Sequence, residues 1–341
     1  MKFGLLTSLQ NPPFNNASHQ QLYKELLEQT AYADKLGYDS FTIPEHHFLQ
    51  DGWCPSLLTT LAAVAARTSN IKIGTACLLL PLHDPIHVAE EAAVLDLISN
   101  GRLILGVTIG YRGEEFEAFG KQRHTRGAVM EEQLKVITQA WTQESFSFNG
   151  KHFTYRNLSV TPKPVQKPHP PIWIGASSEP GIKRAGRWRF PLVASPRHHL
   201  NELKEHYKIY WKSVQEAGTN VTEIPIIRYA YLAETRETAE KQAQDPVMHL
   251  ERDSYGAWVK WRALKDDKGQ AVKDQSEVTY ESHRERFIFG TANDCIQEIE
   301  RCQRELKMNH FIAWTALPGL PQKNVLKSMK LMAEEVIPQF R

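Results

Sequence analysis

The regular alternation of short apolar segments with longer helical segments is the feature of this sequence that most constrains its fold. The apolar segments have the length of buried strands, and helix signals flank the segments between them, such as Ser18 before the first and Gly37 after it. Eight alternations predict an α/β fold of the (β/α)8 TIM-barrel type, in a single domain over residues 1–341. No Gly-x-Gly-x-x-Gly follows a strand, so the fingerprint of a doubly wound dinucleotide fold is missing. The predicted strands are Lys2–Ser8, Asp39–Ile43, Ile71–Leu80, Arg102–Thr108, Ile172–Ala176, Phe190–Ala194, Pro225–Leu232 and Asn309–Trp314.

Two stretches break the alternation. Residues 143–171, after the fourth βα unit, contain alternating aromatic residues and then several prolines, which predicts an excursion outside the barrel, with a hairpin as one option. Residues 258–289, before the eighth strand, are rich in charge and longer than an inert connection usually is. We interpret this second insertion as a mobile lid. Its path is not fixed by the sequence, because it follows a helix and not a strand.

Composition excludes several classes of protein. The 41 Lys and Arg residues nearly balance the 39 Asp and Glu residues, which gives no electrostatic reason to expect binding to nucleic acid or to an anionic membrane. The N-terminus has no signal-peptide pattern, and no apolar run reaches the length of a membrane span. Four cysteines without a CxxC pair predict a reduced, cytoplasmic protein.

The run Pro44-Glu45-His46-His47-Phe48 follows the second strand directly. Two imidazoles and a carboxylate at a strand end are costly to bury unless they are hydrogen-bonded, and histidine can act as acid, base or ligand near neutral pH. In a βα barrel the carboxyl ends of the strands carry the chemistry. The sequence therefore predicts catalytic residues here, although a surface pair that only fixes the loop is the alternative.

Other strand ends carry candidate side chains as well. Thr108, Gly110 and Tyr111 end or follow the fourth strand, Ser177 and Ser178 follow the fifth, and Trp314 ends the eighth. Trp314 is the best candidate for a substrate-pocket residue for that reason, and a core position is its alternative. The remaining histidines lack carboxylates at ligand spacing, so no metal site is predicted.

Four stretches together resemble the bacterial luciferase-like, flavin-dependent monooxygenase family. They occur in the order expected on a matching βα layout, and the resemblance extends from Lys2 to about Pro338. Each one alone is a weak signal. The stretches are Pro44–Phe48, Gly74–Pro81, Gly101–Tyr111 with its continuation to Gly120, and Pro170–Ser178.

The resemblance implies an activity. Reduced FMN would bind as a dissociable substrate supplied by a separate flavin reductase, oxygen would add to it, and the peroxyflavin would oxidise a small apolar aldehyde or carbonyl compound. His46 matches the family's catalytic histidine, with His47 as its supporting partner and Glu45 orienting either imidazole. The family also implies a homodimer that associates through the helices 57–66 and 86–98.

The resemblance places the flavin at the strand ends. Ser177 and Ser178 precede a helix whose free N–H groups can bind the FMN phosphate, and Gly181 allows close approach. The ring would rest on the third strand, where the family implies a cis peptide bond between Ala76 and Cys77. The implied flavin contacts are Ala76, Cys77, Thr108, Gly110, Tyr111, Ala176, Ser177, Ser178 and Gly181.

The chain also departs from the luciferase pattern. Thr108 stands in place of a reactive cysteine and Ile109 in place of an arginine, so light emission is not predicted and one phosphate partner is missing. Arg112 is a candidate replacement. Two other functions remain open, a deazaflavin-dependent dehydrogenase that moves hydride without oxygen, and a non-catalytic flavin-binding paralogue. The sequence does not identify the organic substrate.

Overall fold

A curled parallel sheet forms the centre of the molecule. The structure is a computed structural model, and it describes residues 1–218, 220–256, 258 and 264–341. Within these residues ten strands join one sheet in the order β11-β10-β12-β1-β2-β3-β5-β8-β9, with β4 paired to β5 beyond the end of β3. A parallel bridge between Ala194, directly after β9, and Ile226 of β10 connects the β9 end back to the rest of the sheet. The strands are β1 (Lys2–Thr7), β2 (Ser40–Ile43), β3 (Lys72–Thr75), β4 (Leu78–Leu79), β5 (Leu103–Thr108), β8 (Ile172–Gly175), β9 (Leu192–Val193), β10 (Pro225–Leu232), β11 (Phe287–Gly290) and β12 (His310–Ala316).

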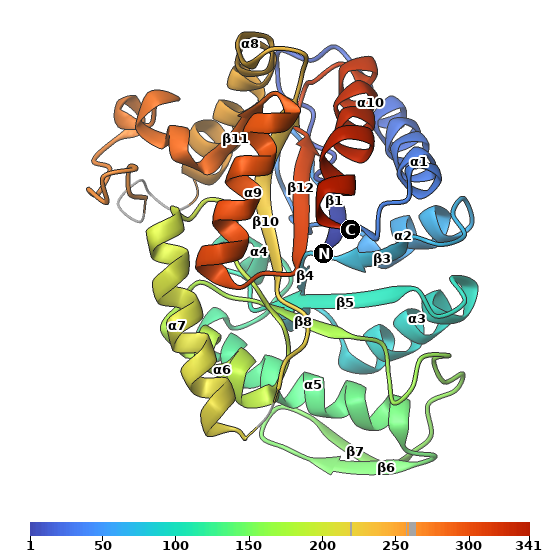
Figure 1. Cartoon of the computed structure of the whole chain (residues 1–341). Helices are drawn as coiled ribbons and strands as arrows, with labels where there is room; N and C mark the ends of the chain where they lie inside the picture. Colours follow the sequence, from blue (N-terminus) through green and yellow to red (C-terminus); the bar gives the residue numbers. More distant parts are fainter. Residues whose placement is uncertain (219, 257, 259–263) are drawn as a thin grey trace.

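Helices cover the outside of this sheet (Figure 1). Their ends follow local sequence rules, as in α1, where the Ser18 hydroxyl accepts a hydrogen bond from Gln21 N and Gly37 closes the helix with φ +79°. Met1 and Phe340 are hydrogen-bonded, so the two termini lie together. The helices are α1 (His19–Leu36), α2 (Leu57–Ala65), α3 (Pro85–Ile98), α4 (Gly113–Ala118), α5 (Arg126–Thr142), α6 (Glu179–Trp188), α7 (Leu200–Glu216), α8 (Arg236–Met248), α9 (Ala292–Leu306) and α10 (Gln322–Leu331).

Every predicted strand is present, but the chain adds one that the sequence did not indicate. Phe287–Gly290 forms β11, which pairs in parallel with the second half of β10, from Tyr229–Phe287 to Leu232–Gly290. The predicted seventh helix also ends early, because α8 gives way after Met248 to a π-helix over His249–Gly256.

The two interruptions have different contents. In 143–171, β6 (Phe146–Asn149) and β7 (Thr154–Leu158) form an antiparallel pair that lies beside α5 in Figure 1. Of the predicted lid 258–289, residues 259–263 lie outside the described residues, and the remainder contains the new strand β11 together with two short 3-10 turns. The lid therefore stays a prediction.

Two large apolar clusters pack against the two faces of the sheet. One lies between the strands and the surrounding helices, and the other fills the concave interior with large side chains such as Trp173, Tyr229 and Trp314. No helix among the described residues has the length and apolar character needed to cross a bilayer.

Candidate functional site

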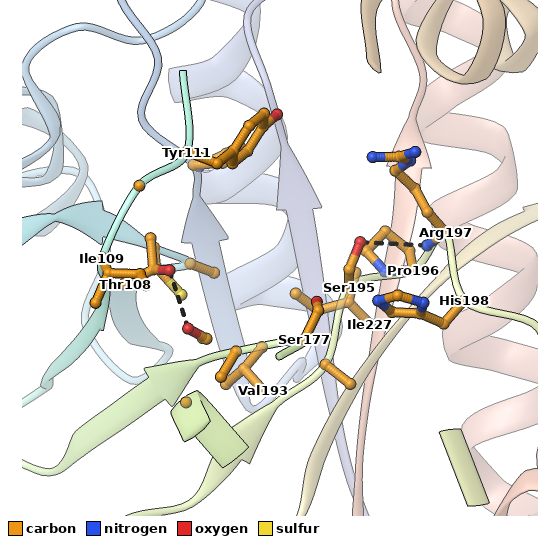
Figure 2. A pocket seen from close by; sticks show the side chains of 18 of the residues that line it. Thr108, Ile109, Tyr111, Ser177, Val193, Ser195, Pro196, Arg197, His198 and Ile227 are labelled. Atoms are coloured by element: carbon orange, nitrogen blue, oxygen red, sulfur yellow. Dashed lines mark hydrogen bonds between the residues drawn. The ribbon is translucent and has the colours of Figure 1, made fainter. Parts of the chain in front are cut away.

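A cavity of about 440 Å³ opens at the carboxyl ends of the strands. This volume lies within the range of about 300–1,000 Å³ that is typical of ligand pockets. Figure 2 shows Thr108, Ile109 and Tyr111 on one side of it and Ser195, Pro196, Arg197 and His198 on the other. His47 is not among its lining residues, whereas the other predicted site residues are: Glu45, His46, Ala76, Cys77, Thr108, Gly110, Tyr111, Ala176, Ser177, Ser178, Gly181 and Trp314.

His46 is held in place by Glu115. Its Nδ1 lies 2.9 Å from Glu115 Oε1, and the backbone N–H of His47 donates to the same oxygen at 3.1 Å. Arg112 adds a third contact at 3.2 Å. Burial raises the pKa of Glu115, but these donors outweigh burial and lower it overall, so the carboxylate is ionised. A carboxylate acceptor at Nδ1 fixes the tautomer of His46, with its proton on Nδ1.

Aromatic side chains enclose the His46 ring. Trp53, Tyr111, Tyr255 and Trp258 lie around it with ring centroids 4.8, 5.6, 6.5 and 4.9 Å away, respectively. Only 6% of His46 is exposed. Among the described residues no hydrogen-bond partner is found for its Nε2, which is therefore free to act on a molecule in the cavity.

Glu45 contacts His47, which is one of the two imidazoles that it was expected to orient, and it also contacts His83. Its Oε1 lies 2.8 Å from both His47 Nε2 and His83 Nε2, and its Oε2 accepts from Leu79 N. The expectation that Glu45 could support His46 is therefore corrected, since Glu115 has that position. His47 turns away from the cavity, with its ring 4.8 Å from that of Phe119. The Glu45 contacts fix the loop after β2 to the segment after β3.

The ends of β3, β5 and β8 form an apolar wall of the cavity. The peptide bond between Ala76 and Cys77 is cis, which confirms the expectation from the family pattern. Thr108 donates its hydroxyl proton to Gly175 O at 2.9 Å (Figure 2). A Cβ at position 175 would lie 2.6 Å from Cys77 Sγ, so Gly175 leaves space for the thiol. Burial raises the pKa of Cys77 to about 12, which keeps the thiol neutral.

The other end of the cavity can hold an anion. Ser178 is the N-cap of α6 and its side chain makes no cap hydrogen bond, while a Cβ at Gly181 would lie 3.0 Å from that of Ala176. Arg126 and Arg184 line this end as well. Arg184 donates to Glu131 at 2.7 Å, and the buried Nε of Arg126 has no partner among the described residues.

Arg126 and Arg184 line this end of the cavity, and Arg112, which was the candidate for a phosphate partner, does not. The guanidinium of Arg112 is engaged by Glu115 and by His47 O, the latter at 2.6 Å, and it does not line the cavity. Arg126 follows β5 by 18 positions, at the start of α5, and Arg184 lies on α6. Their positions along the chain gave no reason to choose either arginine as a phosphate partner.

The loop after β9 adds residues that the sequence analysis missed. Ser195, Pro196, Arg197 and His198 all line the cavity. The guanidinium of Arg228, which is buried, donates to Pro196 O at 3.2 Å, to His198 O at 2.8 Å and to Glu285 O at 3.1 Å. The loop follows the sixth predicted strand, so the same strand-end rule that selected Ser177 could have found it.

A family model described as luciferase-like monooxygenase matches residues 1–309. The chain belongs to this family. Its fold and the order of its site segments are thus those expected from the four sequence stretches.

This chain is similar to proteins that are named as monooxygenases and to one that is named as a dehydrogenase. The oxygenase component of the flavin-dependent trigonelline monooxygenase of Acinetobacter baylyi is 25% identical over 100% of this chain and 96% of its own length. The oxygenating constituent of 3,6-diketocamphane monooxygenase of Pseudomonas putida, solved in complex with FMN, has a TM-score of 0.84 at 21% identity and covers 100% of this chain and 99% of its own. An F420-dependent secondary alcohol dehydrogenase, covering the same shares of the two chains, has a TM-score of 0.78 at 20% identity. At these identities the two solved structures support the fold alone.

We expect the Glu45 contacts to make this luciferase-like chain sensitive to acid. Burial opposes ionisation of Glu45, yet the donors from His47, His83 and Leu79 lower its pKa from 4.5 to about 2. Because the folded-state pKa is lower than the unfolded one, the stabilisation is complete above about pH 4.5 and is lost as the pH falls toward 2. A shift of this size corresponds to roughly 3 kcal/mol.

Denaturant unfolding of a Glu45→Gln variant between pH 7 and pH 3 measures this effect. The free-energy difference from the unmodified protein should be largest near pH 7 and should shrink in acid. Glu179→Gln, which changes an exposed acid, is the matched control and should leave stability unchanged. A Glu45→Gln difference that is constant with pH would contradict the assignment.

Proposed function

We propose that this chain is the oxygenase component of a flavin-dependent monooxygenase that uses reduced FMN and O2 to oxidise a small organic substrate. The observation that carries the proposal is the geometry of His46. A histidine fixed by an ionised carboxylate on one nitrogen faces a cavity with its other nitrogen, and the same cavity ends at a helix N-terminus flanked by two arginines.

The residues present fit FMN. The N-terminus of α6, with Ser177 and Ser178, offers N–H and hydroxyl donors to a phosphate, and Arg126 brings a buried Nε that has no partner among the described residues. Arg184 adds a second positive charge. Between this end and His46, the apolar wall at Ala76 and Cys77 suits a flat ring. When bound, reduced FMN supplies the electrons that activate O2.

His46 would manage the proton in this reaction. With Nδ1–H directed at Glu115, Nε2 can accept a proton from a molecule in the cavity and return it later. The aromatic side chains around His46 exclude water from this nitrogen, and exclusion of bulk water limits unproductive breakdown of reactive species. Arg112 and Glu115 act on His46 through position and charge, without touching the cavity.

A separate reductase is the implied partner. The similarity to a protein named as an oxygenase component supports a two-component system, in which another protein supplies reduced flavin.

Binding of reduced FMN tests the cofactor. We expect anaerobic titration to show saturable binding of reduced FMN, and Arg184→Gln or Arg126→Gln to weaken it about tenfold or more while changing riboflavin binding little, because riboflavin lacks the phosphate. Arg187→Gln is the matched control, since Arg187 lies on the same helix with an exposed side chain. Reduced deazaflavin F420 binding more tightly than reduced FMN would overturn the proposal in favour of a dehydrogenase.

Substitution of His46 tests the proton role. We expect His46→Ala to bind reduced FMN normally and to lower turnover by about 10²-fold, as loss of a general acid or base does. Glu115→Gln should give a smaller loss, since the carboxylate holds the His46 ring through Nδ1 and fixes its tautomer. His87→Ala, at an exposed position on α3, is the control. Turnover at the unmodified rate in His46→Ala would remove the role.

Assembly as a homodimer is the remaining part of the proposal. Val94, Leu97 and Ile98 of α3 are exposed although apolar, and α2 next to it presents the small residue Ala63. Sedimentation at micromolar concentration should therefore give a two-fold dimer, and Leu97→Glu should convert it to a monomer. Glu91→Gln on the same helix should not. A monomeric unmodified protein would refute the dimer.

A further inference from the structure

The guanidinium of Arg197 has no hydrogen-bond partner within the part of the chain that the structure describes. No described residue accepts a hydrogen bond from it, its Nε is buried, and only 14% of its side chain is exposed. Its nearest acid is Glu251, at 3.9 Å from Nε, which is beyond hydrogen-bonding distance. Arginine carries five N–H donors, and leaving them unpaired away from water is costly. An acceptor in the cavity would remove that cost.

Glu251 does not fill this need, because its Oε1 lies beyond hydrogen-bonding distance of Arg197 Nε. It is fully buried, and its Oε1 accepts the hydroxyl proton of Tyr229 at 2.7 Å. Glu251 therefore places a carboxylate near Arg197 without occupying the planar fork of its guanidinium. The fork remains available for a bidentate contact with a carboxylate.

Arg197 belongs to the His46 end of the cavity. Its guanidinium lies over the ring of Tyr255, 4.6 Å from the centroid, and Tyr255 is one of the aromatic residues around His46. The charge of Arg197 also acts on the hydroxyl of Tyr111, whose ring lies 5.6 Å from that of His46. In Figure 2 Arg197 and Tyr111 lie on opposite sides of the cavity. The arginines at the α6 end, Arg126 and Arg184, are different residues.

Several residues that line the cavity near His46 carry unpaired donors. Arg197 Nε, the Tyr111 hydroxyl and Trp314 Nε1 are buried and have no partner among the described residues. Within the same part of the chain the Oε2 atoms of Glu115 and Glu251 are unpaired acceptors, but neither residue lines the cavity. A ligand with several acceptor oxygens satisfies such groups, whereas an alkyl chain does not. Tyr111 and Tyr255, which line the cavity, supply aromatic faces and edges against which a flat ring can pack.

We propose that Arg197 determines substrate specificity by binding the carboxylate of a small aromatic acid. This inference rests on the proposed function and replaces the apolar aldehyde that the sequence resemblance implies. The carboxylate lies on the guanidinium, the ring packs among the aromatic residues, and the substrate is thereby held beside His46. An anionic oxygen could come instead from the phosphate of FMN, so the experiment separates these two sources.

The test compares acids with their neutral amides by isothermal titration calorimetry, with and without oxidised FMN. The probes are benzoate and benzamide, pyridine-3-carboxylate and its amide, and hexanoate and hexanamide as a non-aromatic pair. We expect at least one aromatic acid to bind about tenfold or more tightly than its amide, which is the range for a charge-assisted hydrogen bond. In Arg197→Gln this preference should vanish, and in Arg197→Lys it should be reduced and not lost.

The preference for FMN over riboflavin is measured on the same variants. Arg197→Gln should retain it, whereas Arg184→Gln should lose it and keep the preference for the acid. The proposal is overturned if no aromatic acid binds better than its amide, or if Arg197→Gln loses the preference for FMN and not that for the acid. Failure of the flavin proposal would be seen separately, as absence of FMN binding while acid binding persists. Circular dichroism and thermal melting establish that each variant is folded.

Discussion

The ionised, fully buried carboxylate of Glu115 is the group on which the geometry of the site depends. It accepts hydrogen bonds from Nδ1 of His46, from the backbone N–H of His47 and from the guanidinium of Arg112. These bonds connect the loop after β2 to α4, which follows β5. Removing one partner from such a buried ion pair leaves the other charge unpaired, which typically lowers the free energy of unfolding by about 3–5 kcal/mol. The position of His46 is therefore set by a residue 69 positions further along the chain.

The parallel sheet explains how groups so far apart in sequence come together. Each strand ends at the same edge, so that His46, Thr108, Ser177 and Arg197 line one cavity although they lie at or after the ends of four different strands. The space has two ends of different chemistry. One is a helix N-terminus flanked by Arg126 and Arg184, and the other is an aromatic enclosure around His46 with the guanidinium of Arg197 beside it.

The sequence predicted what depends on local pattern and missed what depends on side-chain direction. Strand ends and the caps of α1 followed from apolar runs and short motifs. The motifs and the resemblance together selected twelve of the residues that line the cavity, and the resemblance placed the cis bond at Ala76–Cys77. Glu45 orients His47 and not His46, because the two adjacent histidines point in opposite directions, which only the folded backbone decides. Arg126 and Arg197 were missed because neither forms part of a motif. Strand β11 was hidden because its four residues close a charged segment whose composition does not indicate a strand.

Arg228 supports the backbone of the loop after β9, whereas the chemistry of that loop depends on the side chain of Arg197. Its guanidinium holds the carbonyl groups on both sides of Arg197, those of Pro196 and His198, and leaves the side chain at position 197 unconstrained by those bonds. The backbone at this point is thus anchored from β10, whatever side chain is carried there. Members of a family built in this way can exchange one residue and acquire a different ligand while the loop keeps its path, so that diversification of substrates need not disturb folding.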